Sequence, residues 1–558
     1  MRRDNRNKNK KRNILVMCGI IIALVIILPT IFLNIVEKDK NKGKIQIIIN
    51  NNNVTSKLKN AAYINQKDVV YMSITDIKNY LDNYIYNDKE NNQIITTYGE
   101  KIGVLSTTQN TININNTKLN ILSGIETKND EVYIPISLMS NVYNMEMTII
   151  KDKKVLTMDS LDRELIKMDA SKNLKVRNKK TFFSRPVDKI KKGEKVIVIE
   201  EKDGWSKIRT TKGKIGYVKT SGLQNKVYVR NKLEKEKQIT GKVNMVWDYF
   251  SEYAKVPNRN GTTIEGVNVV SPTFFHLVKN GDGKISTNIG TNGTNYISWA
   301  KQNNYKVWGM FSNNSYKDTT SKILNSYTLR TNLINSIVNL ANTYNLDGIN
   351  IDFENMSKSD KEMFSRFIIE LKPKLQEAGK VLSVDVTAMD GGDDWSECYD
   401  RNAIGNVADY VVFMAYDQYT SNSSKAGTTA GYNWIETNIK KFIDREEVKS
   451  EKIILAMPLY TRLWQEQNGK LSSKTVSMKE IDNTIPSDVQ KTWNDDLKQY
   501  YVEYEKKGIT YKMWIEDEAS FKAKLGLVKT YNLAGVATWE KDREKEGIWS
   551  VIKEELNN

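Results

Sequence analysis

Apolar runs alternate with amphipathic stretches from residue 241 to the end of the chain at residue 558. Eight mostly apolar runs recur there, at 243–250, 266–275, 306–311, 348–353, 382–387, 410–416, 453–459 and 534–539. Strands that are continuously apolar are buried on both faces, as in a parallel sheet covered by helices. Eight strand–helix units predict an α/β fold of the TIM (β/α)8 barrel type. Before the last run, residues 492–521 predict an inserted small α+β segment followed by a helix.

Residues 45–158 contain short strands, one or two helices and an internal repeat. The segment VYMSI at 70–74 recurs as VYIPI at 132–136, and each copy continues into an amphipathic stretch and then a strand. A repeated strand–helix–strand unit predicts a duplicated small α+β module.

Residues 174–223 are short β-rich runs with glycine-containing turns between them, which predicts a small β-barrel. We expect Trp205 to fill its core, because small barrels need large side chains inside. The alternative is that Trp205 forms a platform for a ligand. A charged connector at 224–240 is expected to lead into the C-terminal barrel.

The first 36 residues have the pattern of a membrane anchor. Seven Lys and Arg residues lie within 1–13, and twenty residues without a charge follow at 14–33. As a helix these would span roughly 30 Å, the thickness of a bilayer's hydrocarbon core. We expect a transmembrane signal anchor at 14–36, a cytoplasmic basic tail at 1–13 and the rest of the chain outside the cell membrane. The alternative is a cleaved signal peptide, which has a shorter apolar region and a small-x-small cleavage site.

Composition and charge narrow the possible functions. The net charge is +17, with basic residues along the whole chain, so polyanions are favoured partners. No nucleic-acid motif accompanies this charge, so anionic lipid or acidic wall polymers fit better than nucleic acid. The single histidine, His276, excludes histidine-based triads and histidine-rich metal sites. We expect no metal or other cofactor, and no disulfide, because Cys18 lies in the apolar segment and Cys398 is the only other cysteine.

The fourth apolar run ends in a polar face. Side chains alternate along a strand, so Asn350, Asp352 and Glu354 share one face, and the apolar residues between them share the other. Polar side chains are costly in a barrel core but not at its C-terminal mouth, where TIM-barrel active sites lie. Two neighbouring carboxyls do not both ionise easily, so one pKa rises. A carboxylic acid that stays protonated near neutral pH can protonate a glycosidic oxygen.

This strand end resembles the motif of family 18 glycoside hydrolases, Asp-x-x-Asp-x-Asp-x-Glu. The motif corresponds here to Asp347, Asn350, Asp352 and Glu354, with Asn350 in place of the second aspartate. With asparagine at this position, the motif also resembles that of the family's branch of spore and cell-wall glucosaminidases. The resemblance implies substrate-assisted catalysis, an exception to the scheme with two catalytic carboxylates. Glu354 would protonate the leaving oxygen and then activate water, and Asp352 would hold the 2-acetamido group, whose oxygen is the nucleophile.

Two further strand ends resemble the same family. The sixth run ends in Met414-Ala415-Tyr416-Asp417, like the family's Met-x-Tyr-Asp. By this resemblance Tyr416 is a third catalytic residue that binds the acetamido oxygen, Met414 lines the pocket and Asp417 contacts the distorted sugar. Trp539, at the end of the eighth run, would form the floor of the sugar subsite, with core packing as the alternative. We expect Asn350, Met414, Asp417 and Trp539 to bind substrate.

The N-terminal modules resemble two other families. Residues 45–158 resemble the copper amine oxidase N-terminal-like domain, although the absence of histidine removes any basis for copper binding. Residues 174–223 resemble a bacterial SH3-like domain. The family 18 resemblance covers 241–558.

Together these patterns predict a membrane-anchored extracellular glycosidase that cleaves β-1,4 bonds next to N-acetylated amino sugars, with peptidoglycan as the expected substrate. The alternatives are a chitinase acting on chitin-like oligomers, a lectin-like protein that binds glycans without cleaving them, and a structural wall tether. The choice between glucosaminidase and muramidase specificity stays open, as does the oligomeric state.

Overall fold

The computed structural model describes residues 45–99, 101–115, 117–121, 123–230, 239–251 and 257–557. This part of the chain divides into two compact units, one holding the N-terminal modules and one the C-terminal barrel. The expected tail at 1–13 and anchor at 14–36 lie outside the described residues. Within the described ranges, no helix is both long and apolar enough to cross a membrane.

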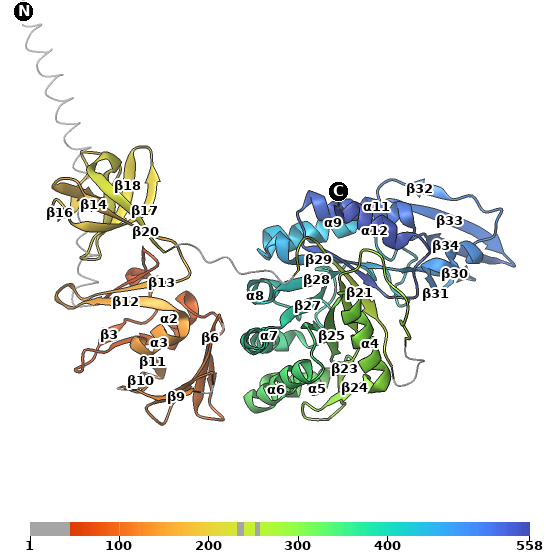
Figure 1. Cartoon of the computed structure of the whole chain (residues 1–558), viewed down its shortest axis with the longest axis horizontal. Helices are drawn as coiled ribbons and strands as arrows, with labels where there is room; N and C mark the ends of the chain where they lie inside the picture. The colour runs from red at the N-terminus through yellow and green to blue at the C-terminus, as the bar shows by residue number, and fades with distance from the viewer. Residues whose placement is uncertain are drawn as a thin grey trace, which may run out of the picture. The chain divides into compact units, whose positions relative to one another are not determined.

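The C-terminal unit contains a closed barrel of eight parallel strands (Figure 1). The ring closes where β22 pairs with β25 and where β35 pairs with both β21 and β29. This architecture confirms the predicted TIM barrel, and each strand falls on one of the eight apolar runs. The strands are β21 (Val243–Asp248), β22 (Val269–Pro272), β25 (Lys306–Ser312), β26 (Gly348–Asp352), β27 (Val381–Thr387), β28 (Tyr410–Met414), β29 (Ile453–Pro458) and β35 (Gly535–Trp539).

Helices cover the outside of the barrel, as the alternating pattern predicts. Apolar side chains on the outer face of the strands pack against them in the main core, which includes Ile349, Ile351 and Phe353. A second, smaller core fills the barrel interior around Trp308 and Met310. The helices are α4 (Gly290–Gln302), α5 (Lys317–Asn325), α6 (Tyr327–Thr343), α7 (Lys361–Glu377), α8 (Arg401–Val407), α9 (Tyr432–Lys440), α11 (Glu518–Thr530) and α12 (Ile548–Asn557).

The insertion between β29 and β35 is larger than the sequence predicts. It forms a five-stranded antiparallel sheet in the order β31-β30-β34-β33-β32, followed by α11. The predicted range 492–521 misses its first two strands, because β30 starts two residues after β29 ends and the apolar run hides the break. The elements are β30 (Tyr460–Gln467), β31 (Lys470–Ser477), α10 (Ile481–Thr484), β32 (Thr492–Asn494), β33 (Gln499–Lys506) and β34 (Ile509–Trp514). A short hairpin, β23 (Phe275–Leu277) and β24 (Ile285–Thr287), follows β22.

The repeat module contains the two predicted copies. β4 (Val70–Ser73) leads into α2 (Ile74–Tyr80), and β11 (Glu131–Pro135) leads into α3 (Ile136–Tyr143). The equivalent strands β4 and β11 pair with each other, so the two copies share one core. The other strands are β1 (Gln46–Ile49), β2 (Asn52–Asn53), β3 (Tyr63–Ile64), β5 (Tyr86–Asp88), β6 (Gln93–Tyr98), β7 (Lys101–Ser106), β8 (Thr111–Ile114), β9 (Thr117–Asn120), β10 (Glu126–Lys128), β12 (Met145–Ile150) and β13 (Val155–Ser160).

The SH3-like module is one seven-stranded sheet, β16-β15-β19-β18-β17-β14-β20. It extends beyond the expected 174–223, because β14 and the edge strand β20 pair with each other. Residues 224–230, expected to be a connector, are therefore strand, on which Val227, Tyr228 and Val229 are exposed. Trp205 is buried, at 7% exposed. The strands are β14 (Leu165–Ala170), β15 (Leu174–Arg177), β16 (Pro186–Ile190), β17 (Lys195–Lys202), β18 (Trp205–Arg209), β19 (Ile215–Lys219) and β20 (Leu223–Arg230).

Candidate active site

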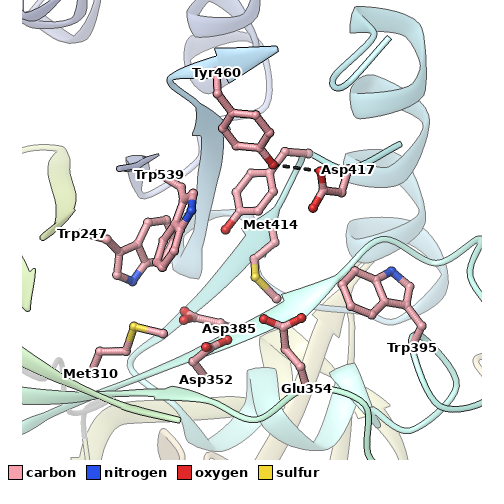
Figure 2. Close-up of a pocket in the computed structure, with 11 residues that line it drawn as sticks. Trp247, Met310, Asp352, Glu354, Asp385, Trp395, Met414, Asp417, Tyr460 and Trp539 are labelled. Carbon is pink, nitrogen blue, oxygen red and sulfur yellow. Dashed lines mark hydrogen bonds between the residues drawn. The ribbon is translucent and has the colours of Figure 1, made fainter. Parts of the chain in front are cut away.

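An open pocket lies at the C-terminal ends of the barrel strands. It encloses about 570 Å³ of space that is continuous with solvent. Figure 2 shows acidic, aromatic and methionine side chains from several strand ends converging on it. The lining residues are Trp247, Met310, Asp352, Glu354, Asp385, Trp395, Met414, Tyr416, Asp417, Tyr460 and Trp539.

Strand β26 delivers the two predicted carboxyls to this pocket. Ile351 and Phe353 point outward into the main core, so Asp352 and Glu354 face the opposite way. β26 ends at Asp352, and Glu354 follows two residues later at the mouth. The alternation predicted from the sequence therefore places both carboxyls where a bound molecule can reach them.

The backbone of Glu354 is fixed by Asn313, a fully buried residue just after β25. The Glu354 amide donates to Asn313 Oδ1 at 3.0 Å, and Asn313 Nδ2 donates to the Glu354 carbonyl at 2.9 Å. Burial raises the pKa of the Glu354 carboxyl well above its usual range, and the charge of Asp352 and a hydrogen bond with it raise it further. A raised pKa favours the protonated form that a general acid needs.

Asp352 lies beside a second buried acid. Burial raises the pKa of Asp352 to about 8, and the charge of Asp385 contributes, while a hydrogen bond with Glu354 opposes the rise. Asp352 is 7% exposed and Asp385 is fully buried. Asp352, Glu354 and Asp385, three of the four carboxyls that line the pocket, thus lie close together, so they titrate as a coupled group.

The last residue of β28 and the residues that follow it also line the pocket. Met414 and Tyr416 line the pocket together, as their shared parity predicts. Burial raises the pKa of Tyr416 well above its usual range, so its hydroxyl remains a hydrogen-bond donor. Asp417 adopts a left-handed backbone conformation, with φ of 57°. Its Oδ1 accepts from the Tyr460 hydroxyl at 2.8 Å, which holds the carboxylate toward the pocket (Figure 2).

Trp539 forms an aromatic wall together with Trp247. The two rings meet at 5.6 Å between centroids with an interplanar angle of 64°. Trp247 is held in place because its Nε1 donates to Asn350 Oδ1 at 2.8 Å. Both indoles line the pocket, so Trp539 contributes more than core packing.

Asn350 is the one predicted site residue that does not line the pocket. It is fully buried inside the barrel, where it joins four strands by side-chain hydrogen bonds. Asn350 faces the barrel interior, as its parity predicts, and contacts Trp247, Ser271, Ser383 and Asp385 there. Its contact with substrate stays a prediction.

Five lining residues were not predicted: Trp247, Met310, Asp385, Trp395 and Tyr460. A signal existed for Asp385, since Ser383, Asp385 and Thr387 alternate with valines along an otherwise apolar run. A carboxyl on the inner face of a barrel strand is costly to bury, so it indicates a site there, as the acids of β26 do. Trp395 and Tyr460 lie in loop and insertion segments, where periodicity carries no information. The single histidine, His276, lies on β23 and does not line this pocket.

Comparison with known families agrees with this geometry. The model for glycosyl hydrolases family 18 matches residues 245–544, that for the bacterial SH3 domain matches 172–224, and that for the copper amine oxidase N-terminal domain matches 48–158. These matches confirm the three resemblances seen in the sequence.

The curated relatives include glycosylases of Bacillus subtilis. The chain is 28% identical to the uncharacterised glycosylase YvbX over 51% of its own length and 84% of that protein. It is 24% identical to a cortical fragment-lytic enzyme over 44% of its own length and 58% of that protein. The chain thus matches little more than half of the length of the second relative.

Solved structures share the barrel. A chitinase from Chromobacterium violaceum superposes with a TM-score of 0.50 at 23% identity, covering 57% of this chain and 99% of that one. The spore cortex-lytic enzyme SleL of Bacillus megaterium superposes with a TM-score of 0.50 at 20% identity, covering 65% and 89%. At these identities the likeness concerns the fold.

A TIM barrel with a raised-pKa carboxyl pair and an aromatic wall at its mouth defines a glycosidase. The chain belongs to glycosyl hydrolases family 18, whose model matches more than half of it.

Proposed function

We propose that the protein is a membrane-anchored glycosidase that cleaves β-1,4 bonds after N-acetylated amino sugars in peptidoglycan, by substrate-assisted catalysis with retention of configuration. The observation that carries this proposal is the convergence of Asp352, Glu354 and Tyr416 on one open pocket. These side chains suit a reaction in which the substrate's own acetamido oxygen is the nucleophile.

In the first step Glu354 donates its proton to the glycosidic oxygen while the bond from that oxygen to C1 breaks. The acetamido oxygen forms a bond to C1 on the opposite face, which gives an oxazolinium ion. Asp352, as a carboxylate, accepts the acetamido N–H and stabilises the positive charge. The Tyr416 hydroxyl donates to the acetamido oxygen and holds it near C1. The raised pKa of Glu354 supports its role as the acid.

In the second step Glu354, now a carboxylate, takes a proton from water. The water oxygen bonds to C1, and the bond from C1 to the acetamido oxygen breaks. Trp539 offers an apolar face on which the sugar's C–H surface can stack. Two displacements at C1 leave its configuration unchanged.

Peptidoglycan as substrate is supported by three observations. The relatives include cortical fragment-lytic enzymes. A bacterial SH3 domain precedes the barrel. The net charge of +17 favours an acidic, polymeric environment.

The anchor and localisation are proposed on sequence alone. The uncharged stretch 14–33, preceded by a basic tail, has the length and charge asymmetry of a single-pass anchor with its C-terminal side outside. The barrel would then face the cell wall.

The test is digestion of purified peptidoglycan and of chitin oligomers by the full-length chain in mild detergent, with new reducing ends identified by mass spectrometry after borohydride reduction. We expect reduced N-acetylglucosamine ends from peptidoglycan. Glu354→Gln should lower turnover on the order of a thousandfold or more and leave glycan binding intact, since the amide cannot donate the acidic proton.

Glu377→Gln, which removes an exposed carboxyl at the end of α7, is the matched control and should cleave normally. Ends from chitin oligomers alone would make the protein a chitinase. Binding without new ends from either substrate would reject hydrolysis of these substrates and favour a lectin.

A further inference from the structure

Asp385 is the buried acid of the pocket to which the proposed reaction gives no role. It lies on β27 beside β26, and Figure 2 shows its carboxyl next to that of Asp352. Asp385 Oδ1 accepts from Asn350 Nδ2 at 2.6 Å. Asp385 Oδ2 and Asp352 Oδ1 are both buried, and neither has a hydrogen-bond partner among the residues that the structure describes.

Asn350 cannot donate a further hydrogen bond or a proton to Asp352 Oδ1 and Asp385 Oδ2. Its Oδ1 accepts from Trp247 and Ser271, and its Nδ2 donates to Ser383 and Asp385. This set uses the hydrogen-bonding capacity of the carboxamide and fixes its orientation. A carboxamide neither takes up nor releases a proton near neutral pH. The ionisable group that the family motif places at position 350 is absent there, and Asp385 supplies one on the adjacent strand.

Electrostatics favours a single proton between Asp352 and Asp385. No residue lining the described pocket is basic, so no cation neutralises a second buried carboxylate. Burial raises the pKa of both acids. A hydrogen bond with Glu354 lowers the pKa of Asp352, and the Asn350 hydrogen bond lowers that of Asp385, each only in part. Two adjacent carboxyls then stay singly ionised over a wide pH range. An O–H···O⁻ bond would satisfy both unpartnered oxygens, and such charge-assisted bonds are among the strongest.

We propose that Asp385 is a positioning residue that shares one proton with Asp352, between Asp352 Oδ1 and Asp385 Oδ2. In the free enzyme the pair carries one negative charge. When the acetamido N–H reaches Asp352, the proton stays on Asp385 and Asp352 is the carboxylate that accepts the N–H. No proton enters or leaves the site in this step. The catalytic half of this inference rests on the proposed function.

Three other titratable groups lie near Asp352 and Asp385. Glu354 lies two residues after Asp352, just beyond the end of β26, and Tyr416 faces both acids from just beyond the end of β28. The buried Tyr399 feels the charge of Asp352 and Glu354 from the loop before α8. Burial raises the pKa of each of these three groups well above its usual value.

The test compares Asp385→Asn with the swapped variant Asn350→Asp/Asp385→Asn, which returns a carboxyl to β26. Asp282→Asn is the control: it removes an exposed carboxyl that pairs with Lys322 and does not line the pocket. We expect Asp385→Asn to lower kcat on the order of 30-fold with little change in KM, and the swap to recover most of that loss. Asp282→Asn should keep the wild-type kcat.

The direction in which the acidic limb of kcat/KM against pH moves on replacing Asp385 tests the shared proton. In the wild type this limb reports the uptake of a second proton by the pair. The proton already shared stabilises the remaining negative charge, so the second is taken up only at low pH. In Asp385→Asn the limb reports a lone buried Asp352, so we expect it to move to higher pH, and back again in the swapped variant. A shift to lower pH would mean that Asp385 only repels Asp352, and would overturn the proposal. So would an unchanged limb.

A second readout does not need turnover. The difference between the infrared pH titrations of the full-length wild type and of full-length Asp385→Asn cancels the carboxyls that both proteins share. It should contain two carboxyl titrations of the wild-type pair, one low and one raised, against a single one in the variant. A wild type that cleaves no glycan but shows the paired titration would reject the proposed function and keep the shared proton. A single independent titration in the wild type would reject the shared proton, whatever the activity.

Discussion

The orientation of the Asp417 carboxylate depends on the hydroxyl of Tyr460. Its Oδ1 accepts from the Tyr460 hydroxyl at 2.8 Å, and Arg462 NH2 lies 3.6 Å from the same oxygen. Tyr460 is the first residue of the insertion and lines the pocket itself. The insertion therefore contributes directly to the position of a proposed sugar-binding carboxylate.

Replacing Tyr460 with Phe should weaken catalysis modestly. The change removes one hydrogen bond to a charged group, worth about 1.5–3 kcal/mol, so kcat/KM should fall roughly 10- to 100-fold. Burial raises the pKa of Tyr460 well above its usual range, so the hydroxyl is a donor throughout the working range and the loss should not vary with pH. Initial rates on peptidoglycan from pH 5 to 9 would measure it. A loss that grows toward alkaline pH would contradict a role for the neutral hydroxyl.

Sequence predicts strand-end residues better than it predicts their neighbours. Glu354, Asp352 and Tyr416 follow from parity and motif, because each occupies a fixed place at the end of an apolar run. Asn350 has the predicted parity, but period two does not say how far below the rim a side chain lies. Asp385 was missed because its run lacked a motif.

At the scale of elements, a buried ion cluster joins α6 to α7. Glu370 accepts from Arg330 through both carboxylate oxygens, at 2.8 and 3.0 Å, and from Arg366 Nε at 2.7 Å. All three side chains are 3% exposed or less. These helices cover the strands that carry the site, so the cluster fixes part of the wall behind β26.

Glu370→Gln should destabilise the barrel by about 3–5 kcal/mol, because it leaves two buried guanidinium groups without their carboxylate. The charges of Arg366 and Arg330 lower the pKa of Glu370 against the opposing effect of burial. A lowered folded-state pKa means that the stability is present above about pH 4.5 and is lost as pH falls below it. Denaturant unfolding at pH 7 and pH 3.5 should show the gap between variant and wild type narrowing at the lower pH.

Asp282→Asn is the matched control, because its partner Lys322 and Asp282 are both more than half exposed. Exposed pairs contribute about 0–1 kcal/mol, so this variant should unfold almost like the wild type. An equal loss of unfolding free energy in both variants would show that the buried cluster stabilises the barrel no more than an exposed ion pair does.

Elements with a clear period were the easiest to predict. All eight barrel strands coincide with apolar runs, since a strand buried on both faces stands out from amphipathic helices. The insertion began 32 residues earlier than predicted, at Tyr460 instead of residue 492, because β30 follows β29 without a polar break. The edge strand β20 was taken for a linker because its sequence continues without a break into the charged segment 231–238.

At the scale of the whole molecule, the proposed anchor decides where the barrel can act. Net charge alone would let a chain of +17 adhere to acidic polymers by contacts that salt weakens. A spanning segment holds by apolar burial, which salt does not weaken. Salt therefore separates the two modes of attachment.

Deleting residues 1–36 should release the protein from membranes, because it removes the whole uncharged stretch and its basic flank. Full-length protein should stay in the membrane pellet through a high-salt wash, while the deleted form should be washed off and still digest purified peptidoglycan at the full-length rate. Replacing the seven basic residues of 1–13 with Gln keeps the span but removes the orientation signal, so protease added outside should then cleave only part of the population. Full-length protein that leaves the pellet in salt would reject a spanning anchor and favour attachment by charge.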